Sequence, residues 1–224
     1  MGVDEVTAPA TAARVFGDRL PLAERFADML AEHGIERGLI GPRELDRLWD
    51  RHLLNSAVIG EHIPDGVGVV DVGSGAGLPG VPLAIARPDL DIVLLEPMAR
   101  RVDWLNEVVA ELGLSATVIR GRAEDGVVRT EVGQHEVVTA RAVAPLARLA
   151  TWCLPLVRTG GSLLALKGSS AAEEIERDKL AVSRAGGGEP VLVRCGEAVL
   201  ETPTVVVRIP RVAPKPSRRR GRKQ

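Results

Sequence analysis

Aromatic side chains are scarce in this chain. They make up 2% of its 224 residues, and tyrosine is absent altogether. Proteins that hold single-stranded nucleic acid commonly stack the unpaired bases on such rings. The sequence therefore gives no indication of a module that binds single strands by stacking.

Cysteines and long apolar runs are scarce as well. The two cysteines, Cys153 and Cys195, form no CxxC motif and no cluster with histidine, so the sequence indicates neither a disulfide framework nor a metal site. No stretch approaches about 18 uninterrupted apolar residues, and residues 1–10 carry acids where a secretory signal would carry cations. We expect a cytoplasmic protein that binds no metal and does not span a membrane.

Positive charge is concentrated at one end of a chain whose formal net charge is only −1. Residues 214–224, PKPSRRRGRKQ, hold six cations and no acid, and removing these six from the 29 cations leaves 23 against 30 acids. The rest of the chain is therefore acidic, and a polyanion would have to be bound locally. Within this basic tail, the candidate contacts to such a partner are Arg218, Arg219 and Arg220.

The hydrophobic pattern divides the chain into three parts. Apolar residues at helical spacing before position 34 and after position 42 predict a helical N-terminal cap over residues 1–62. Residues 63–210 alternate short β-branched runs with helical segments, which predicts an α/β domain with a mostly parallel, Rossmann-like sheet. Its seven expected strands lie at 67–72, 91–96, 116–120, 136–140, 162–166, 191–195 and 204–209. The last two should pair antiparallel because no crossover helix fits between them, and residues 211–224 should lack regular structure.

A glycine-rich segment, DVGSGAGLPG at residues 71–80, follows the first expected strand and opens a helix. In an open α/β sheet this position faces a ligand crevice, and glycines let the backbone approach the ligand closely. We therefore expect an adenosine-like ligand. The segment fits two patterns, a GxGxG motif that starts at Gly73 and the dinucleotide motif GxGxxG that starts at Gly75.

Two residues of this segment favour a cationic ligand over a pyrophosphate. Pro79 has no N–H to donate inside the turn, and the carboxylate of Asp71 would repel a pyrophosphate but attract a sulfonium. Glu96 ends the second expected strand, where a carboxylate can accept hydrogen bonds from both ribose hydroxyls. That feature fits either ligand.

Together, five motifs resemble the RsmG family, also called glucose-inhibited division protein B. They are DVGSGAGLPG at 71–80, LLEPMARRVDWL at 94–105, GRAED at 121–125, TARAVAPL at 139–146 and ALKG at 165–168. Upstream, RHLLNS at 51–56 is similar to the family's RHxxDS, with Asn55 in the acidic position. The resemblance implies a class I S-adenosylmethionine-dependent methyltransferase that modifies N7 of a guanine in 16S rRNA of the small ribosomal subunit. We expect it to act as a monomer.

The resemblance also implies roles for individual residues. Asp71 and the glycine turn would surround the methionine and ribose portions of S-adenosylmethionine, Glu96 would hold the ribose hydroxyls, and Arg141 would sit beside the methyl group and the incoming base as the catalytic candidate. The turn residues concerned are Gly73, Gly75, Gly77 and Leu78, and those expected to flank the adenine are Ala123 and Glu124. His52 and Lys167 are further candidate contacts to the substrate.

The chemistry of guanine N7 suits this set of residues. N7 carries a lone pair and no proton, so it can attack without a general base, and we expect Arg141 to orient the base through O6 or a phosphate. A fork on both N7 and O6 would block the acceptor. Two alternatives stay open, namely a methyltransferase with a different acceptor and a dinucleotide-binding redox or sensor domain, the latter through Gly75, Gly77 and Gly80.

The basic tail generates a prediction of its own. Deleting residues 214–224 should weaken binding to rRNA and flatten the salt dependence of that binding, because phosphate contacts release counterions. Binding isotherms at several salt concentrations measure this slope. A slope equal to that of the full chain would exclude a contribution from the tail.

Overall fold

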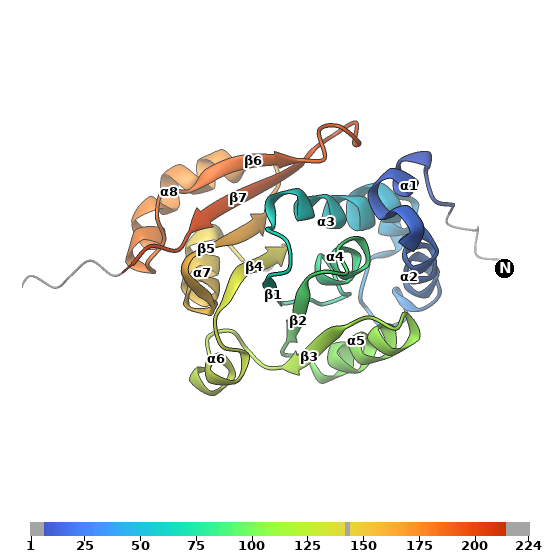
Figure 1. The fold of residues 1–224 in the computed structure, drawn as a ribbon, viewed down its shortest axis with the longest axis horizontal. Helices are drawn as coiled ribbons and strands as arrows, with labels where there is room; N and C mark the ends of the chain where they lie inside the picture. The colour runs from blue at the N-terminus through green and yellow to red at the C-terminus, as the bar shows by residue number, and fades with distance from the viewer. Residues whose placement is uncertain (1–6, 142–143, 214–224) are drawn as a thin grey trace, which may run out of the picture.

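A seven-stranded sheet in the order β3-β2-β1-β4-β5-β7-β6 forms the centre of the molecule (Figure 1). The computed structural model describes residues 7–141 and 144–213. The strands are β1 (Gly68–Val72), β2 (Asp91–Glu96), β3 (Ala116–Arg120), β4 (His135–Arg141), β5 (Val157–Leu166), β6 (Val191–Cys195) and β7 (Thr204–Pro210). The pairs that join β3, β2, β1, β4 and β5 are parallel, whereas β7 pairs antiparallel with both β5 and β6. The predicted sheet is confirmed, but the insertion of β7 between β5 and β6 was not foreseen.

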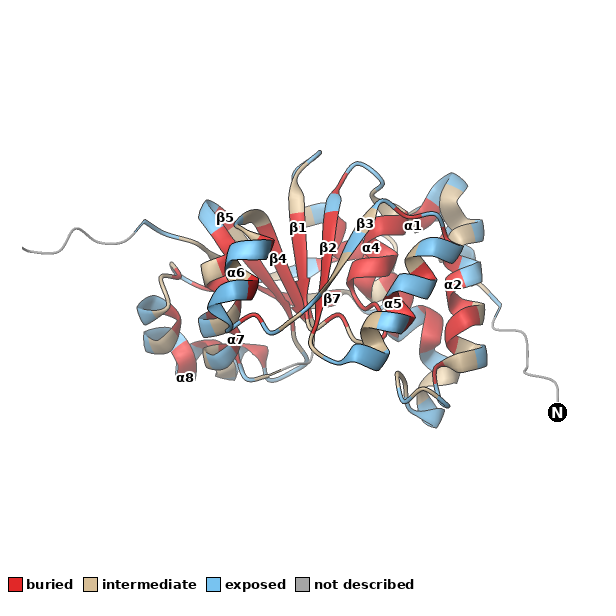
Figure 2. Cartoon of the chain, turned by 90° about the horizontal axis from the view of Figure 1, so that it is seen from below, coloured by how far each residue is buried: buried red, intermediate tan, exposed pale blue. Residues whose placement is uncertain are grey.

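Helices cover both faces of this sheet. They are α4 (Gly80–Ala86), α5 (Ala99–Glu111), α6 (Gly126–Val132), α7 (Leu146–Cys153) and α8 (Ala171–Arg184). Neighbouring residues of β1 belong to different cores, since Val69 packs with α4 and α5 and Val70 packs with α7. This double burial explains why the central strands read as continuous β-branched runs. Figure 2 shows the buried strands between helices whose outer faces are exposed.

The N-terminal region is helical, as predicted, but it is built from short pieces. It comprises α1 (Ala10–Phe16), η1 (Gly17–Arg19), α2 (Leu20–His33), η2 (Pro42–Arg47), η3 (Leu48–Leu54), α3 (Asn55–Ala57) and η4 (Val58–His62). Gly17, with a φ of 52°, ends the first helix. The segment after Pro42 is a 3₁₀ turn followed by a π-helix, so the helical run predicted there is present but is not a regular α-helix.

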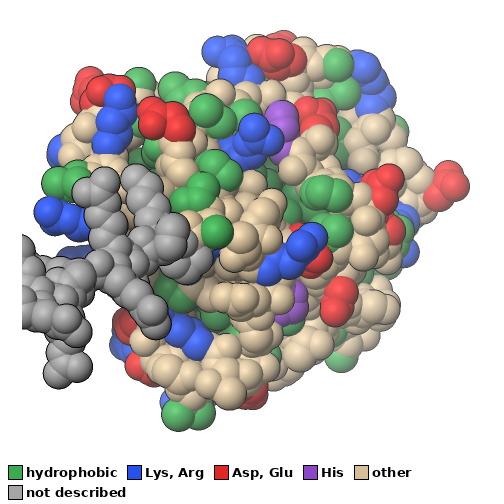
Figure 3. Space-filling model, turned by 60° about the vertical axis from the view of Figure 1, so that its left-hand side comes forward, with side chains coloured by type: hydrophobic (Ala, Val, Ile, Leu, Met, Phe, Trp, Pro, Cys, Tyr) green, Lys and Arg blue, Asp and Glu red, His purple; other side chains and the backbone are tan. Residues whose placement is uncertain are grey.

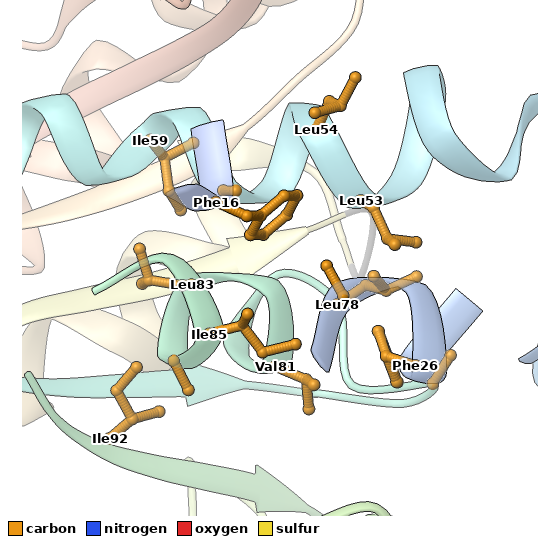
Figure 4. Close-up of a cluster of buried hydrophobic side chains, with 14 of the residues drawn as sticks. Phe16, Phe26, Leu53, Leu54, Ile59, Leu78, Val81, Leu83, Ile85 and Ile92 are labelled. Atoms are coloured by element: carbon orange, nitrogen blue, oxygen red, sulfur yellow. The ribbon is translucent and has the colours of Figure 1, made fainter. Parts of the chain in front are cut away.

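This N-terminal cap shares one hydrophobic core with α4 and the glycine segment (Figure 4). Phe26 of α2 is fully buried, and a Cβ built on Gly77 would lie 3.4 Å from the end of its ring. Buried residues on both sides of position 62 belong to this cluster. The cap therefore fixes the position of the turn that follows β1.

Two expectations concern absences, and a third falls outside the described residues. Across residues 7–141 and 144–213, no helix is long and apolar enough to cross a membrane. The same residues contain no group of three or more histidines, cysteines or acids arranged to hold a metal ion. The candidate contacts Arg218, Arg219 and Arg220 lie outside the described residues.

The shared core predicts that the cap contributes directly to the stability of the whole chain. Phe26→Ala should lower the free energy of unfolding by about 3–5 kcal/mol, because it removes a buried ring and leaves a cavity. Val127 is 81% exposed, so Val127→Ala should change the free energy of unfolding by less than about 0.5 kcal/mol. Urea unfolding of both variants tests this, and similar values for the two would contradict the packing.

Candidate functional site

Asp71 lies at the carboxyl end of β1 and is completely buried. One carboxylate oxygen accepts a hydrogen bond from the N–H of Gly80 at 3.0 Å, and the other accepts one from the Thr139 hydroxyl at 3.2 Å. Burial raises the pKa of Asp71 to about 6, against the opposing effect of these donors. Asp71 therefore joins the end of the glycine turn to β4, and its oxygens face the protein.

The glycine turn bends back sharply between β1 and α4. Gly73, Gly75 and Gly77 have φ values of 74°, 57° and 98°, a region that glycine occupies without strain. A Cβ on Gly77 would come within 2.7 Å of Val81, and a Cβ on Gly80 within 2.8 Å of an oxygen of Asp71. The glycines are thus required by the shape of the turn as well as by any close approach of a ligand.

Most amide groups of the turn point into the protein. The N–H groups of Gly73 and Ser74 donate to the carbonyl of Leu95 at 2.8 and 3.2 Å, and those of Gly77 and Leu78 donate to the carbonyl of Ser74 at 2.8 and 3.0 Å. The Leu78 side chain is buried in the core shared with the cap, so only its backbone is available to a ligand. A pyrophosphate would need free amides at this position, which disfavours the dinucleotide alternative.

Glu96 ends β2 beside this turn and is only 2% exposed. One oxygen accepts from the N–H of Gly75 at 2.9 Å, and the other accepts from the N–H of Met98 at 3.0 Å. The Glu96 carbonyl accepts from the N–H of Gly121 at 3.1 Å, which ties the ends of β2 and β3 together. Each carboxylate oxygen retains a second lone pair for a further donor.

The residues expected to flank an adenine lie after β3. Ala123 is buried, and its carbonyl accepts a hydrogen bond from Arg129 at 2.7 Å. Glu124 is exposed and lies 3.9 Å from Arg122. The ends of β1, β2 and β3 therefore bring the predicted turn, acid and loop to one edge of the sheet.

Arg141 ends β4, the neighbour of β1, and contacts the cap. Its Nη1 donates to Nδ1 of His52 at 3.0 Å, and Nε2 of the same ring lies 2.6 Å from Glu44. Burial lowers the pKa of Arg141 to about 10, in spite of the nearby charge of Asp71. Arg141 therefore remains a cation at neutral pH, and both nitrogens of the His52 ring have partners.

Lys167 follows β5 and is held inside the protein. Its ammonium donates to the carbonyl of Ala144 at 2.8 Å and to Glu174 at 2.9 Å, and its side chain is 8% exposed. Glu174 also accepts from the N–H of Leu146, the first residue of α7. A cleft of about 450 Å³ opens beside these residues, between the end of β5 and the start of α8. In this arrangement Lys167 shapes the wall of the cleft.

The remaining polar residues singled out above have structural partners. Asn55, in the position of the family's acid, accepts a hydrogen bond from the Thr204 hydroxyl at 2.9 Å. Cys153 and Cys195 are buried. Burial raises the pKa of the Cys153 thiol and raises that of Cys195 to about 12, which keeps both protonated. Neither is suited to act as a covalent nucleophile.

Sequence reasoning missed two residues of this edge, Glu44 and Thr139. Thr139 belongs to TARAVAPL but lies inside a strand, where its contact with Asp71 spans 68 positions and leaves no local signal. Glu44 precedes His52 by eight positions. In a regular helix, residues eight positions apart lie within the same broad stripe of the surface. Part of this contact could therefore have been predicted from the sequence.

Comparisons with known proteins identify relatives that match most of this chain. The family model described as rRNA small subunit methyltransferase G matches residues 19–200. Relatives described as ribosomal RNA small subunit methyltransferase G include one from Rhodococcus jostii (strain RHA1), 59% identical over 94% of this chain and 92% of its own. Another, from Mycobacterium sp. (strain KMS), is 54% identical over 97% of this chain and 96% of its own.

Solved structures share the fold. A putative S-adenosyl-L-methionine-dependent methyltransferase from Methanococcus maripaludis aligns with a TM-score of 0.59 at 13% identity, covering 78% of this chain and 94% of that one. Fibrillarin from Aeropyrum pernix, solved with bound S-adenosyl-L-methionine, gives 0.53 at 18% identity, covering 71% and 74%. The architecture is therefore that of class I S-adenosylmethionine-dependent methyltransferases.

The raised pKa of Asp71 predicts a pH-dependent stability. Its folded pKa of about 6 exceeds an unfolded value of about 3.9, so the stabilising contribution of Asp71 is complete below about pH 4 and is lost as the pH rises through 6. The difference in unfolding free energy between wild type and Asp71→Asn should therefore decrease over this window, as urea titrations at successive pH values would show.

Asp89→Asn provides a matched control. The Arg87 guanidinium beside Asp89 holds the pKa of that carboxyl well below its usual value, so its contribution is lost only below about pH 4. Above pH 5 the difference in unfolding free energy between wild type and Asp89→Asn should be constant. If the difference for Asp71→Asn were also constant between pH 4 and 6, the pKa of the Asp71 carboxyl would not be raised by burial.

Proposed function

Because the chain belongs to the rRNA small subunit methyltransferase G family, we propose that it transfers a methyl group from S-adenosylmethionine to N7 of a guanine in 16S rRNA. The structural observation that supports this most directly is the Glu96 carboxylate beside a glycine turn whose amides already have protein acceptors. Such a turn is suited to a sulfonium-bearing nucleoside rather than to a pyrophosphate.

The residues at the sheet edge fit this cofactor in two respects. The Glu96 carboxylate uses one lone pair on each oxygen for the amides of Gly75 and Met98, which leaves acceptor positions for the two ribose hydroxyls. A Cβ on Gly75 would meet no protein atom closer than 3.7 Å, so its absence leaves room for a ligand against the backbone, whereas the missing Cβ of Gly77 makes room for Val81 and Phe26. Ala123 and Glu124 would flank the adenine from the loop after β3.

When bound, S-adenosylmethionine supplies an electrophilic methyl group on a positively charged sulfur. The part of the protein is to orient the acceptor, since guanine N7 needs no general base. Arg141 holds its positive charge at the end of β4, where it would contact O6 or a phosphate and leave N7 free. The Asp71 carboxylate, behind the turn, lends this edge a negative charge that favours a cationic donor.

Binding of rRNA would depend on local contacts. On the face shown in Figure 3, Lys and Arg side chains are interspersed with Asp and Glu and do not form a continuous basic surface. Arg218, Arg219 and Arg220 would add contacts to phosphates, and Lys167 would support the cleft beside α7 and α8 without touching the base. We propose that the enzyme acts in the cytoplasm, as a monomer, on the small ribosomal subunit.

Methylation of isolated small subunits tests the proposal. With labelled S-adenosylmethionine, the wild type should place label in 16S rRNA, and digestion should recover it as 7-methylguanosine. Glu96→Ala should reduce the label at least about tenfold, because the ribose hydroxyls lose a charged acceptor worth roughly 1.5–3 kcal/mol. Glu176→Ala, at a residue whose side chain is 72% exposed, should behave as wild type.

Other outcomes would overturn the assignment. Label in a metabolite fraction but not in rRNA would indicate a different acceptor, and label in rRNA at another nucleoside would refute N7 of guanine. Equal loss in Glu96→Ala and Glu176→Ala would remove Glu96 from the cofactor site.

A further inference from the structure

We propose that Glu44 and His52 of the N-terminal cap form a positioning relay that holds the guanidinium of Arg141 in its working orientation. The effect of this relay on methyl transfer rests on the proposed function, but the geometry of the relay can be tested independently of that function. Glu44 lies in η2, His52 in η3 and Arg141 at the end of β4. The distances are 2.6 Å from Glu44 Oε2 to His52 Nε2 and 3.0 Å from His52 Nδ1 to Arg141 Nη1.

Hydrogen-bond chemistry allows only one arrangement of protons in this relay. A guanidinium only donates, so His52 Nδ1 must accept and cannot carry a proton. The ring proton then lies on Nε2, where it donates to the carboxylate of Glu44. Glu44 thus selects the tautomer of His52 that can accept from Arg141, and the imidazole must be neutral for the relay to hold.

Burial, supported by the charge of Arg141, favours the neutral form of the His52 ring. Five charged groups bear on the relay, namely Glu44 and Arg47 from η2, Arg51 from η3 itself, Arg141 from β4 and Asp71 from β1 behind Arg141. Burial, and after it the charge of Arg141, lower the pKa of His52 below its usual value, although Glu44 acts in the opposite direction. A proton on Nδ1 would place a donor against a donor and a cation against a cation.

The contact with His52 restricts the orientation of the Arg141 guanidinium. An arginine side chain has many rotamers and loses conformational entropy when it is held in one of them. Arg141 stands at the last position of β4, where the backbone alone does not fix its guanidinium. His52 reaches it across 89 positions of sequence from a π-helix, a backbone form often found at functional sites. Among the described residues, this bond occupies one N–H of Arg141 and leaves others for the substrate.

Two substitutions at His52 separate positioning from packing. His52→Asn keeps an acceptor near the place of Nδ1, whereas His52→Gln carries its amide one methylene further out, near the place of Nε2, so its acceptor oxygen is displaced from Arg141. The turnover of His52→Gln should fall roughly tenfold or more below that of His52→Asn, because a guanidinium of Arg141 that is held in the wrong place misaligns the base with the methyl group. Affinity for S-adenosylhomocysteine should be similar in the two variants. Equal turnover would refute the relay.

The pH dependence gives a second test. Turnover of the wild type at saturating S-adenosylmethionine should fall on the acid side as His52 takes up a proton, and in His52→Asn only the part of this fall that protonation of Asp71 causes should remain. Glu44→Gln removes a charge that stabilises the imidazolium, so the acid limb should move to lower pH. Asp50→Asn, an exposed acid in the same segment, should leave the limb in place. A limb that is the same in Glu44→Gln and wild type would contradict the role of Glu44.

A spectroscopic readout distinguishes failure of the relay from failure of the proposed function. Nitrogen-15 NMR of the ligand-free chain, with the His52 signals assigned through His52→Asn, should show the proton on Nε2 at neutral pH. A protonated Nδ1 would refute the relay whatever the enzyme methylates. The expected tautomer in a chain that fails to label rRNA would uphold the geometry and refute the function.

Discussion

The buried carboxylate of Asp71 is the interaction on which the site depends. It fixes the N–H of Gly80 at the start of α4 and the hydroxyl of Thr139 in β4, so the turn, the helix and two strands meet at one charged group. An ionised group in such a place is costly unless donors surround it. The charge of Arg141 provides part of that compensation, because it lowers the pKa of Asp71 against the larger effect of burial.

The N-terminal cap is best understood as part of this edge. Its apolar residues pack against α4 and the turn, with Phe26 directly beneath Gly77, and its polar residues reach Arg141 through His52. Packing contacts from the cap therefore support the glycine turn, and its polar contacts support Arg141 at the same edge of the sheet. A methyl transfer to a nucleophile that needs no base depends on alignment, and a rigid support of both provides alignment.

Local patterns predicted most of the sheet and the turn. Strands such as Asp91–Glu96 and Val191–Cys195 begin and end as their β-branched runs indicate, and the turn at Gly73 to Gly77 was identified because its residues are adjacent. What failed depends on distant parts of the chain. β5 begins at Val157, five positions before the expected start, because Gly160 and Gly161 interrupt the β-branched pattern that predicts a strand. The position of β7 is set by its pairing with β5 on one side and β6 on the other.

The same distinction applies to the site. Glu96, at the end of a strand, was identifiable from position alone, whereas the contacts of Asp71, His52 and Lys167 lie with residues that are remote in sequence or on unpredicted turns. Lys167 illustrates the limit, because a cation after a strand has the same sequence pattern whether it meets a substrate or, as here, Ala144 and Glu174. Side-chain partners of this kind follow from the assembled fold.

Isothermal titration calorimetry of the full chain is the most direct test of the central claim, that this edge of the sheet receives an adenosyl sulfur compound. S-adenosylhomocysteine should bind with saturable heat at one site per chain, and NAD at the same concentrations should give none. Uptake of NAD, or no uptake of S-adenosylhomocysteine by correctly folded protein, would contradict the assignment of the glycine turn and of Glu96.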